Sequence, residues 1–199
     1  MRGVFIAIDG IDGCGKGTII QKLVRELPKE KTFVTREPFN RTRMKEFFSK
    51  PNAIQRKEEA LTMYTEDREH HCTVMQAHLE AGNIIICDRY KYATYAYQTA
   101  QGLPFELVHE SQKKFMAPDV AIIIDIPASE SMKRMQKDAQ RRQLFEFEQE
   151  AFLGKVRENF LKLPGALKEN IVIVDGNKSP DEVYAAVKQE AMRVLQKIL

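Results

Sequence analysis

The sequence predicts an α/β fold, a three-layer sandwich in which helices cover both faces of a five-stranded parallel sheet. Short apolar runs alternate with longer amphipathic stretches along the 199 residues, which is the pattern of buried parallel strands connected by helices. A glycine-rich segment follows the first apolar run directly. Ligands of such folds bind beyond the carboxyl ends of the strands, so we expect the functional residues at that edge.

Five apolar runs have the length and flanking residues of buried strands. They are residues 4–8, 32–35, 84–87, 120–126 and 171–174. The stretches with apolar residues at helical spacing are 15–27, 44–48, 53–81, 92–100, 104–116, 129–137, 148–163 and 180–198. Strand and helix alternate without a long linker or an internal repeat, so residues 1–199 are predicted to form a single domain.

Composition excludes several classes of function. Lys and Arg number 31 against 28 Asp and Glu, a net charge of +3, which is too balanced to indicate a nucleic-acid-binding protein. The cysteines Cys14, Cys72 and Cys87 form no CxxC pair, so we expect free thiols in a reducing compartment. The chain begins almost at once with a strand and has no apolar run near the roughly 18 residues of a membrane helix. We therefore expect no membrane partner and a cytoplasmic location.

The glycine-rich segment has the pattern of a P-loop. Its residues are Gly10, Ile11, Asp12, Gly13, Cys14, Gly15, Lys16, Gly17 and Thr18. Backbone amides of such a loop surround phosphates, and its lysine places a positive charge on the β and γ oxygens. A nucleoside triphosphate is the expected ligand. Gly17 stands where switch GTPases and motor ATPases carry the hydroxyl that binds Mg²⁺, and here the hydroxyl comes one residue later, on Thr18.

Two further strands end in charged residues. Asp88 and Arg89 follow the run 84–87, and Arg36 follows the run 32–35. At the carboxyl edge of the sheet, Asp88 is suited to hold Mg²⁺ through water, while the arginines are suited to grip phosphate. Arginines at two strand ends in addition to the P-loop indicate a site for two anions.

At this point the chain resembles a known family, the thymidylate kinases, which are P-loop nucleoside monophosphate kinases that phosphorylate dTMP. The resemblance extends over essentially the whole chain. It rests on residues 5–13, the TREP quartet at 35–38, Tyr64-Thr65-Glu66-Asp67-Arg68, Asp88-Arg89-Tyr90 followed by Ala96-Tyr97-Gln98, Pro118-Asp119, and residues 142–146. It implies transfer of a phosphoryl group from ATP to dTMP with Mg²⁺, by a homodimeric enzyme.

The resemblance also implies roles for residues of the acceptor site. Arg36 and Arg89 are expected to hold the 5′-phosphate of the acceptor. Arg68 is expected to reach toward the thymine base, and Tyr64 to stack on it in place of the more usual phenylalanine.

Other positions carry further implied contacts. Thr94 and Gln98 match polar contacts at or near the base edge, and Tyr97 matches a tyrosine that packs against the sugar and disfavours a 2′-hydroxyl. Asp12 matches a carboxylate close to the acceptor sugar and the metal.

The catalytic charge is expected from Lys16, Arg89 and a short lid at about 137–148. Within this lid, Arg141 or Arg142 is expected to close over the transferring group, because the loop carries Cys14 where some family members have an arginine. The usual Asp-Arg-x-Glu of the lid is replaced by Gln143-Leu144-Phe145-Glu146, so either arginine fits the role.

Two alternatives follow from the same residues. One is the same phosphoryl transfer to another acceptor, such as dUMP, dGMP or a nucleoside. The other is a nucleotide-dependent switch, which would need a guanine-reading Asn-Lys-x-Asp. The nearest candidate, residues 177–180, lacks the final Asp.

Overall fold

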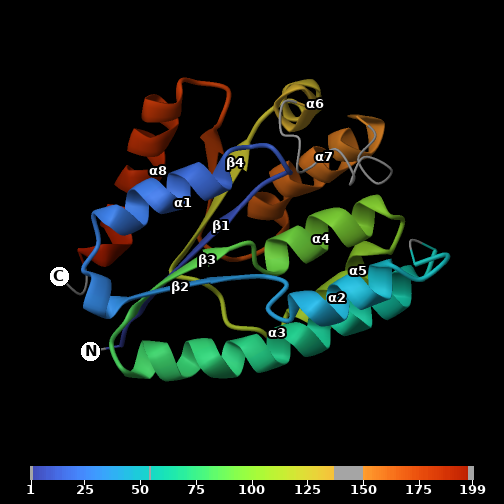
Figure 1. Ribbon diagram of the computed structural model, residues 1–199, viewed down its shortest axis with the longest axis horizontal. Coiled ribbons are helices and arrows are strands. Elements are labelled where there is room, and N and C mark those ends of the chain that lie inside the picture. Colours follow the sequence, from blue (N-terminus) through green and yellow to red (C-terminus); the bar gives the residue numbers. More distant parts are fainter. Residues whose placement is uncertain (1, 54, 137–149, 197–199) are drawn as a thin grey trace.

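A computed structural model describes residues 2–53, 55–136 and 150–196. Within these ranges, a five-stranded sheet is covered by helices on both faces (Figure 1). The predicted three-layer α/β fold is therefore confirmed. The segment expected to form the lid lies outside the described residues, and so do Arg141 and Arg142.

All five strands run parallel, in the order β2-β3-β1-β4-β5. They are β1 (Val4–Asp9), β2 (Thr32–Arg36), β3 (Ile84–Asp88), β4 (Val120–Asp125) and β5 (Ile171–Asp175). Four of them extend one residue beyond the predicted run, to a charged residue. Asp88 stands opposite both Ile8 and Arg36 in the register, so the ends of the first three strands meet at one edge.

Helices cover the two faces unequally (Figure 1). On one face lie α1 (Lys16–Arg25) and α8 (Pro180–Leu195). The other face carries α3 (Lys57–Glu80), α4 (Lys91–Ala100), α7 (Glu150–Ala166) and, packed against α3 and α4, α5 (Phe105–Gln112). The helices α2 (Arg41–Phe48) and α6 (Ala128–Gln136) follow the carboxyl ends of β2 and β4, and a short 3₁₀ helix, Lys29–Lys31, precedes β2.

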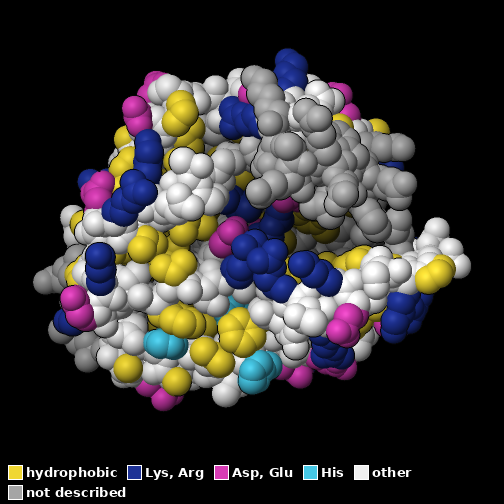
Figure 2. All heavy atoms as spheres, in the orientation of Figure 1, with side chains coloured by type: hydrophobic (Ala, Val, Ile, Leu, Met, Phe, Trp, Pro, Cys, Tyr) yellow, Lys and Arg dark blue, Asp and Glu magenta, His cyan; other side chains and the backbone are white. Residues whose placement is uncertain are grey.

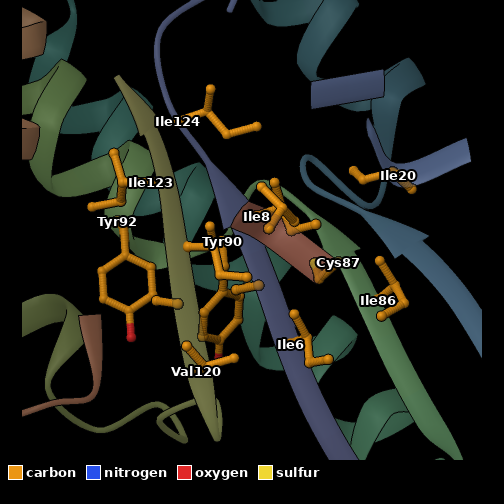
Figure 3. Packing of buried hydrophobic residues seen from close by; sticks show 14 of the residues in the cluster. Ile6, Ile8, Ile20, Ile86, Cys87, Tyr90, Tyr92, Val120, Ile123 and Ile124 are labelled. Carbon is orange, nitrogen blue, oxygen red and sulfur yellow. The ribbon is translucent and has the colours of Figure 1, made fainter. Parts of the chain in front are cut away.

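The core consists mainly of branched side chains from the central strands (Figure 3). Ile6 and Ile8 of β1 are fully buried, and the ring of Phe5 meets that of Tyr90 edge-on at 5.0 Å. Burying each large apolar side chain contributes about 1.5–3 kcal/mol. The strand ends, and the loops that leave them, are therefore attached to the most tightly packed part of the molecule.

Several helix boundaries differ from the prediction by a few residues, among them the start of α2 and the end of α5, and two further differences have a clear cause in the packing. The helix expected from residue 53 begins at Lys57, because Ala53 belongs to a turn and packs with Met44 and Phe47 in a separate small cluster. The apolar residue at position 53 therefore fits helical spacing only because the turn packs against α2. The other helix, α7, was expected to end at residue 163 but continues past Pro164 to Ala166, and Leu163 is buried in the core.

The three cysteines are free, as predicted, and Cys14 and Cys87 are buried. In the part of the chain that the structure describes, no helix has the length and apolar character needed to span a membrane.

Candidate active site

Residues 10–15 form the loop that connects β1 to α1. The φ angles of Gly10, Gly13 and Gly15 are 139°, 74° and 95°, in the region that L residues rarely adopt. A Cβ on Gly10 would lie 2.4 Å from the carbonyl oxygen of Ile124, so the close approach of loop and β4 also requires glycine. The loop leads into the N-terminus of α1, where first-turn amides without intrahelical partners attract anions.

Lys16 is the first residue of α1 and is largely buried. Its Nζ donates to the carbonyl oxygens of Gly10 at 2.9 Å and Ile11 at 3.0 Å, and lies 3.4 Å from the Sγ of Cys14. The carbonyl oxygens of the loop thus hold the ammonium group close to the place where phosphate is expected to bind.

A pocket at this loop, which we call the P-loop pocket, contains most of the predicted donor residues. Its lining is Asp12, Gly13, Gly15, Lys16, Gly17, Thr18, Arg36, Asp88, Arg89, Arg134 and Met135. Gly10, Ile11 and Cys14 support the loop without lining the pocket. Figure 2 shows Lys and Arg side chains gathered beside a hollow near the middle of the face in view. Basic groups around a helix N-terminus suit a polyphosphate.

The oxygen donors of the P-loop pocket suit Mg²⁺. Asp88 lies 3.8 Å from Nη2 of Arg36 and is about one-fifth exposed, and the hydroxyl-bearing Thr18 lines the same pocket. No group of three or more Asp, Glu, His or Cys side chains able to bind a metal occurs among the described residues. Mg²⁺ is commonly held by one or two carboxylates together with substrate phosphates and water, so Asp88 and Thr18 fit this ion.

A second pocket, which we call the aromatic pocket, adjoins the first. Its lining is Asp12, Glu37, Pro38, Tyr64, Asp67, Arg68, Arg89, Tyr90, Ala93, Thr94, Tyr97, Gln98 and Gln101. All the predicted acceptor residues are here except Arg36, which lines the P-loop pocket. Asp12 and Arg89 line both pockets. A ligand in one pocket therefore lies next to a ligand in the other.

At this junction, the Asp12 carboxylate joins the two pockets. Its Oδ1 accepts from the guanidinium of Arg89, and its Oδ2 accepts from the hydroxyl of Tyr97 at 2.8 Å. The Arg89 guanidinium also lies over the Tyr97 ring, 5.3 Å from its centre. Burial alone would lower the pKa of Arg89, but the surrounding acidic groups, Asp12 first and then Tyr97, Asp9 and Asp88, together outweigh it and hold this pKa well above its usual value. Arg89 is a permanent cation at the junction.

Arg68 lies in a buried polar network beneath the aromatic pocket. Its Nε donates to Glu37 at 2.9 Å, its Nη2 to Glu37 and, at 2.9 Å, to the Thr94 hydroxyl, and its Nη1 to Gln112. Glu37 also contacts Nδ1 of His71 at 3.1 Å. Burial opposes the charge of Arg68, and the Glu37 carboxylate reverses this effect, so the pKa of Arg68 is raised. The side chain is held in one place on the pocket floor.

Tyr64 and Gln98 add an uncharged ring and a polar amide to the aromatic pocket. Burial raises the pKa of Tyr64 to about 12, so its phenol stays neutral and presents an uncharged ring. Gln98 is buried, and its Oε1 has no hydrogen-bond partner among the described residues. An apolar ring beside an unsatisfied amide suits a planar heterocycle with polar edges.

Sequence reasoning missed four residues of this site. Glu37 belongs to the TREP quartet, and its role in holding Arg68 is not visible from the sequence. Asp67 accepts from the backbone amides of residues 39 and 40 at 2.6 and 2.7 Å and so shapes the loop after β2. Arg134 reaches the P-loop pocket from α6, and Asp9 is fully buried and accepts from the backbone amide of Tyr90, the residue after Arg89. The charged residue that ends β1 was a usable signal for Asp9.

The chain is similar to known thymidylate kinases over nearly its whole length. A family model described as thymidylate kinase matches residues 8–187. A probable thymidylate kinase of Staphylothermus marinus is 37% identical over 192 residues, covering 94% of each chain. One of Methanosarcina acetivorans is 35% identical over the full length of both proteins. A thymidylate kinase of Nitrosomonas eutropha is 33% identical over 94% of this chain and 91% of its own. With the P-loop and the two adjoining pockets, these matches establish that the chain belongs to the thymidylate kinase family.

Proposed function

We propose that this kinase transfers the γ-phosphoryl group of ATP to the 5′-phosphate of dTMP, with Mg²⁺, at the junction of its two pockets. The observation that carries the proposal is that Asp12 and Arg89 line both pockets. Two nucleotides bound in adjoining pockets present their phosphates to each other, and such alignment is the main requirement of phosphoryl transfer.

ATP occupies the P-loop pocket in this proposal. The amides at the N-terminus of α1 and the Lys16 ammonium bind the β- and γ-phosphates. Lys16 then exchanges the carbonyl oxygens of Gly10 and Ile11 for phosphate oxygens. Since both sets of partners are oxygen acceptors, the charge stays satisfied with and without ATP.

The aromatic pocket takes dTMP. Tyr64 stacks on the thymine, while Arg68, Thr94 and Gln98 meet its polar edge and Tyr97 packs against the sugar. The network around Arg68 fixes the positions of its donors before the base arrives. A preorganised polar edge discriminates between bases, because a wrong base leaves buried groups unpaired.

The acceptor phosphate is held at the junction. Arg89 approaches it from the aromatic pocket, and Arg36 from the P-loop pocket. The attacking oxygen already carries negative charge, so no side chain has to remove a proton from it. Catalysis then depends on alignment and on positive charge around the transferring group.

Asp88 and Thr18 would hold Mg²⁺ in the P-loop pocket, directly or through water. When bound, the ion neutralises charge on the β- and γ-phosphate oxygens. Asp12, near the acceptor sugar and the metal, orients Arg89 and Tyr97 through its two oxygens. Arg141 or Arg142 supplies further charge in this proposal, on the resemblance alone.

A coupled assay of ADP release against dTMP, dUMP, dGMP, AMP and thymidine tests the proposal. We expect dTMP to have the highest kcat/KM. Replacing Lys16 by alanine should lower kcat by at least about 10²-fold, because the lysine acts on charge that develops in transfer. The matched control is Lys22→Ala, on the same helix but paired with Asp181 at the surface, which should retain wild-type turnover. Preference for another acceptor, or normal turnover by a folded Lys16→Ala protein, would refute the proposal.

We also propose that the enzyme is a homodimer, as the resemblance implies. Light scattering coupled to size-exclusion chromatography tests this, since a mass of 22.9 kDa corresponds to one chain. A monomer at micromolar concentration would contradict it.

A further inference from the structure

The backbone of Arg89 has an unusual conformation. Its φ is 70°, and among the described residues only Asn52 shares a positive φ without being glycine. L residues with long side chains rarely adopt this region. The surrounding structure must therefore hold the residue there.

Three hydrogen bonds from buried groups hold this backbone. The amide of Arg89 donates to the carbonyl oxygen of Ile8 at 3.0 Å. The thiol of Cys87 donates to the carbonyl oxygen of Arg89 at 2.9 Å, and the amide of Tyr90 donates to Oδ2 of Asp9 at 2.9 Å. The peptide group before Arg89 is thus fixed by the backbone of β1, and the peptide group after it is fixed by the side chains of Cys87 and Asp9 (Figure 3 labels Cys87 and Tyr90).

Asp9 lowers the stability of the fold at this position. Its carboxyl group is fully buried, and Oδ1 has no hydrogen-bond partner among the described residues. Buried carboxyl groups that are only partly satisfied destabilise a fold. Packing alone does not account for it, because an apolar side chain of similar size would avoid that penalty.

We propose that Asp9 and Cys87 are positioning residues, which hold Arg89 in its left-handed conformation and thereby aim its guanidinium at the acceptor phosphate. The end of β1 and the loop after it then act on Arg89 twice: Asp9 fixes its backbone, and Asp12 binds its guanidinium. This inference rests on the proposed role of Arg89 in binding dTMP.

Calorimetric titration with dTMP and, separately, with ATP tests the inference. The variants are Asp9→Ala, Asp9→Asn, Arg89→Ala and the double variant that combines Asp9→Ala with Arg89→Ala. Asp9→Ala should raise the Kd for dTMP about tenfold or more and leave that for ATP within about twofold. Asp9→Asn keeps an acceptor for the Tyr90 amide and should stay within about threefold of wild type. In the Arg89→Ala background, Asp9→Ala should have no further effect on dTMP, because both changes remove the same interaction.

A second pair of variants keeps the inference testable if Asp9→Ala does not fold. Cys87→Ala removes the donor to the Arg89 carbonyl and should raise the Kd for dTMP about threefold, whereas Cys87→Ser restores a donor and should reverse this.

The outcomes separate the inference from the proposed function. If Arg89→Ala weakens dTMP binding while folded Asp9→Ala or Cys87→Ala binds dTMP normally, the positioning role is wrong and the acceptor role of Arg89 stands. Full additivity in the double variant overturns the positioning role in the same way. If Arg89→Ala binds dTMP as tightly as wild type, both are overturned.

Discussion

Replacing Asp9 by asparagine should change how the free energy of unfolding depends on pH. Burial raises the pKa of Asp9 to about 7, against an ordinary value of 3.8, although the positive charges of Arg89 and Lys16 oppose the shift. Between these two values, the folded protein keeps a proton that the unfolded chain has released. The free energy of unfolding therefore falls as the pH rises, by about 1.4 kcal/mol per unit.

From about pH 5 to about pH 8, this loss amounts to about 3 kcal/mol, because titration of the folded state ends near its pKa of about 7. Asparagine cannot titrate, so the stability of Asp9→Asn relative to wild type should increase by that amount over the same range. Urea denaturation at several pH values measures the difference. Asp181→Asn is the control, because Lys22 lowers the pKa of this exposed carboxyl group and it titrates below the range. A relative stability of Asp9→Asn that does not vary with pH would refute the reasoning.

Three other perturbations have defined outcomes. Glu37→Gln should reduce the free energy of unfolding by about 3 kcal/mol, since it leaves the buried guanidinium of Arg68 without its counter-charge. The control, Glu66→Gln, lies at an exposed ion pair and should reduce the free energy of unfolding by under about 1 kcal/mol. Chemical denaturation of the two variants measures the difference. Tyr97→Ala should reduce the kcat/KM preference for deoxy over ribo acceptors by about 1–3 kcal/mol, and an unchanged ratio would leave the ring a packing role only. Arg141→Ala combined with Arg142→Ala should lower kcat by roughly 10²–10⁴-fold with little change in KM; near-normal steady-state turnover would remove both from catalysis.

The strands and the P-loop could be predicted because their signals are local. Consecutive apolar residues such as Ile84–Cys87 specify a buried strand without reference to the rest of the chain. The start of α3 could not be predicted in this way. Ala53 is buried by contacts with α2, so its apolar character resembles helical spacing while it belongs to a turn.

The same distinction applies to the candidate site. The types of residue in the two pockets followed from motifs and from the family resemblance. The burial of Arg68 did not, because its partner Glu37 is 31 positions away in the sequence and only the parallel pairing of β2 with β3 and the packing of α3 bring them together. The burial of Asp9 is a similar case: a carboxylate at a strand end is normally exposed, but this one is fully buried and accepts from the amide of Tyr90, which lies 81 positions away in the sequence.

The position of β1 in the middle of the sheet divides the enzyme into two flanks. Strands β2 and β3 lie on one side, and the segments after them carry Glu37, Tyr90 and most of the aromatic pocket; β4 lies on the other and leads into α6, which brings Arg134 to the P-loop pocket. The loop after β1 and the charged ends of β2 and β3 lie between these flanks, because Arg36, Asp88 and Arg89 also line the P-loop pocket. Acceptor preference can therefore diverge by substitutions at residues that line the aromatic pocket alone, such as Tyr64 and Gln98, whereas a change in the shared loop or at Arg89 alters the handling of both nucleotides at once.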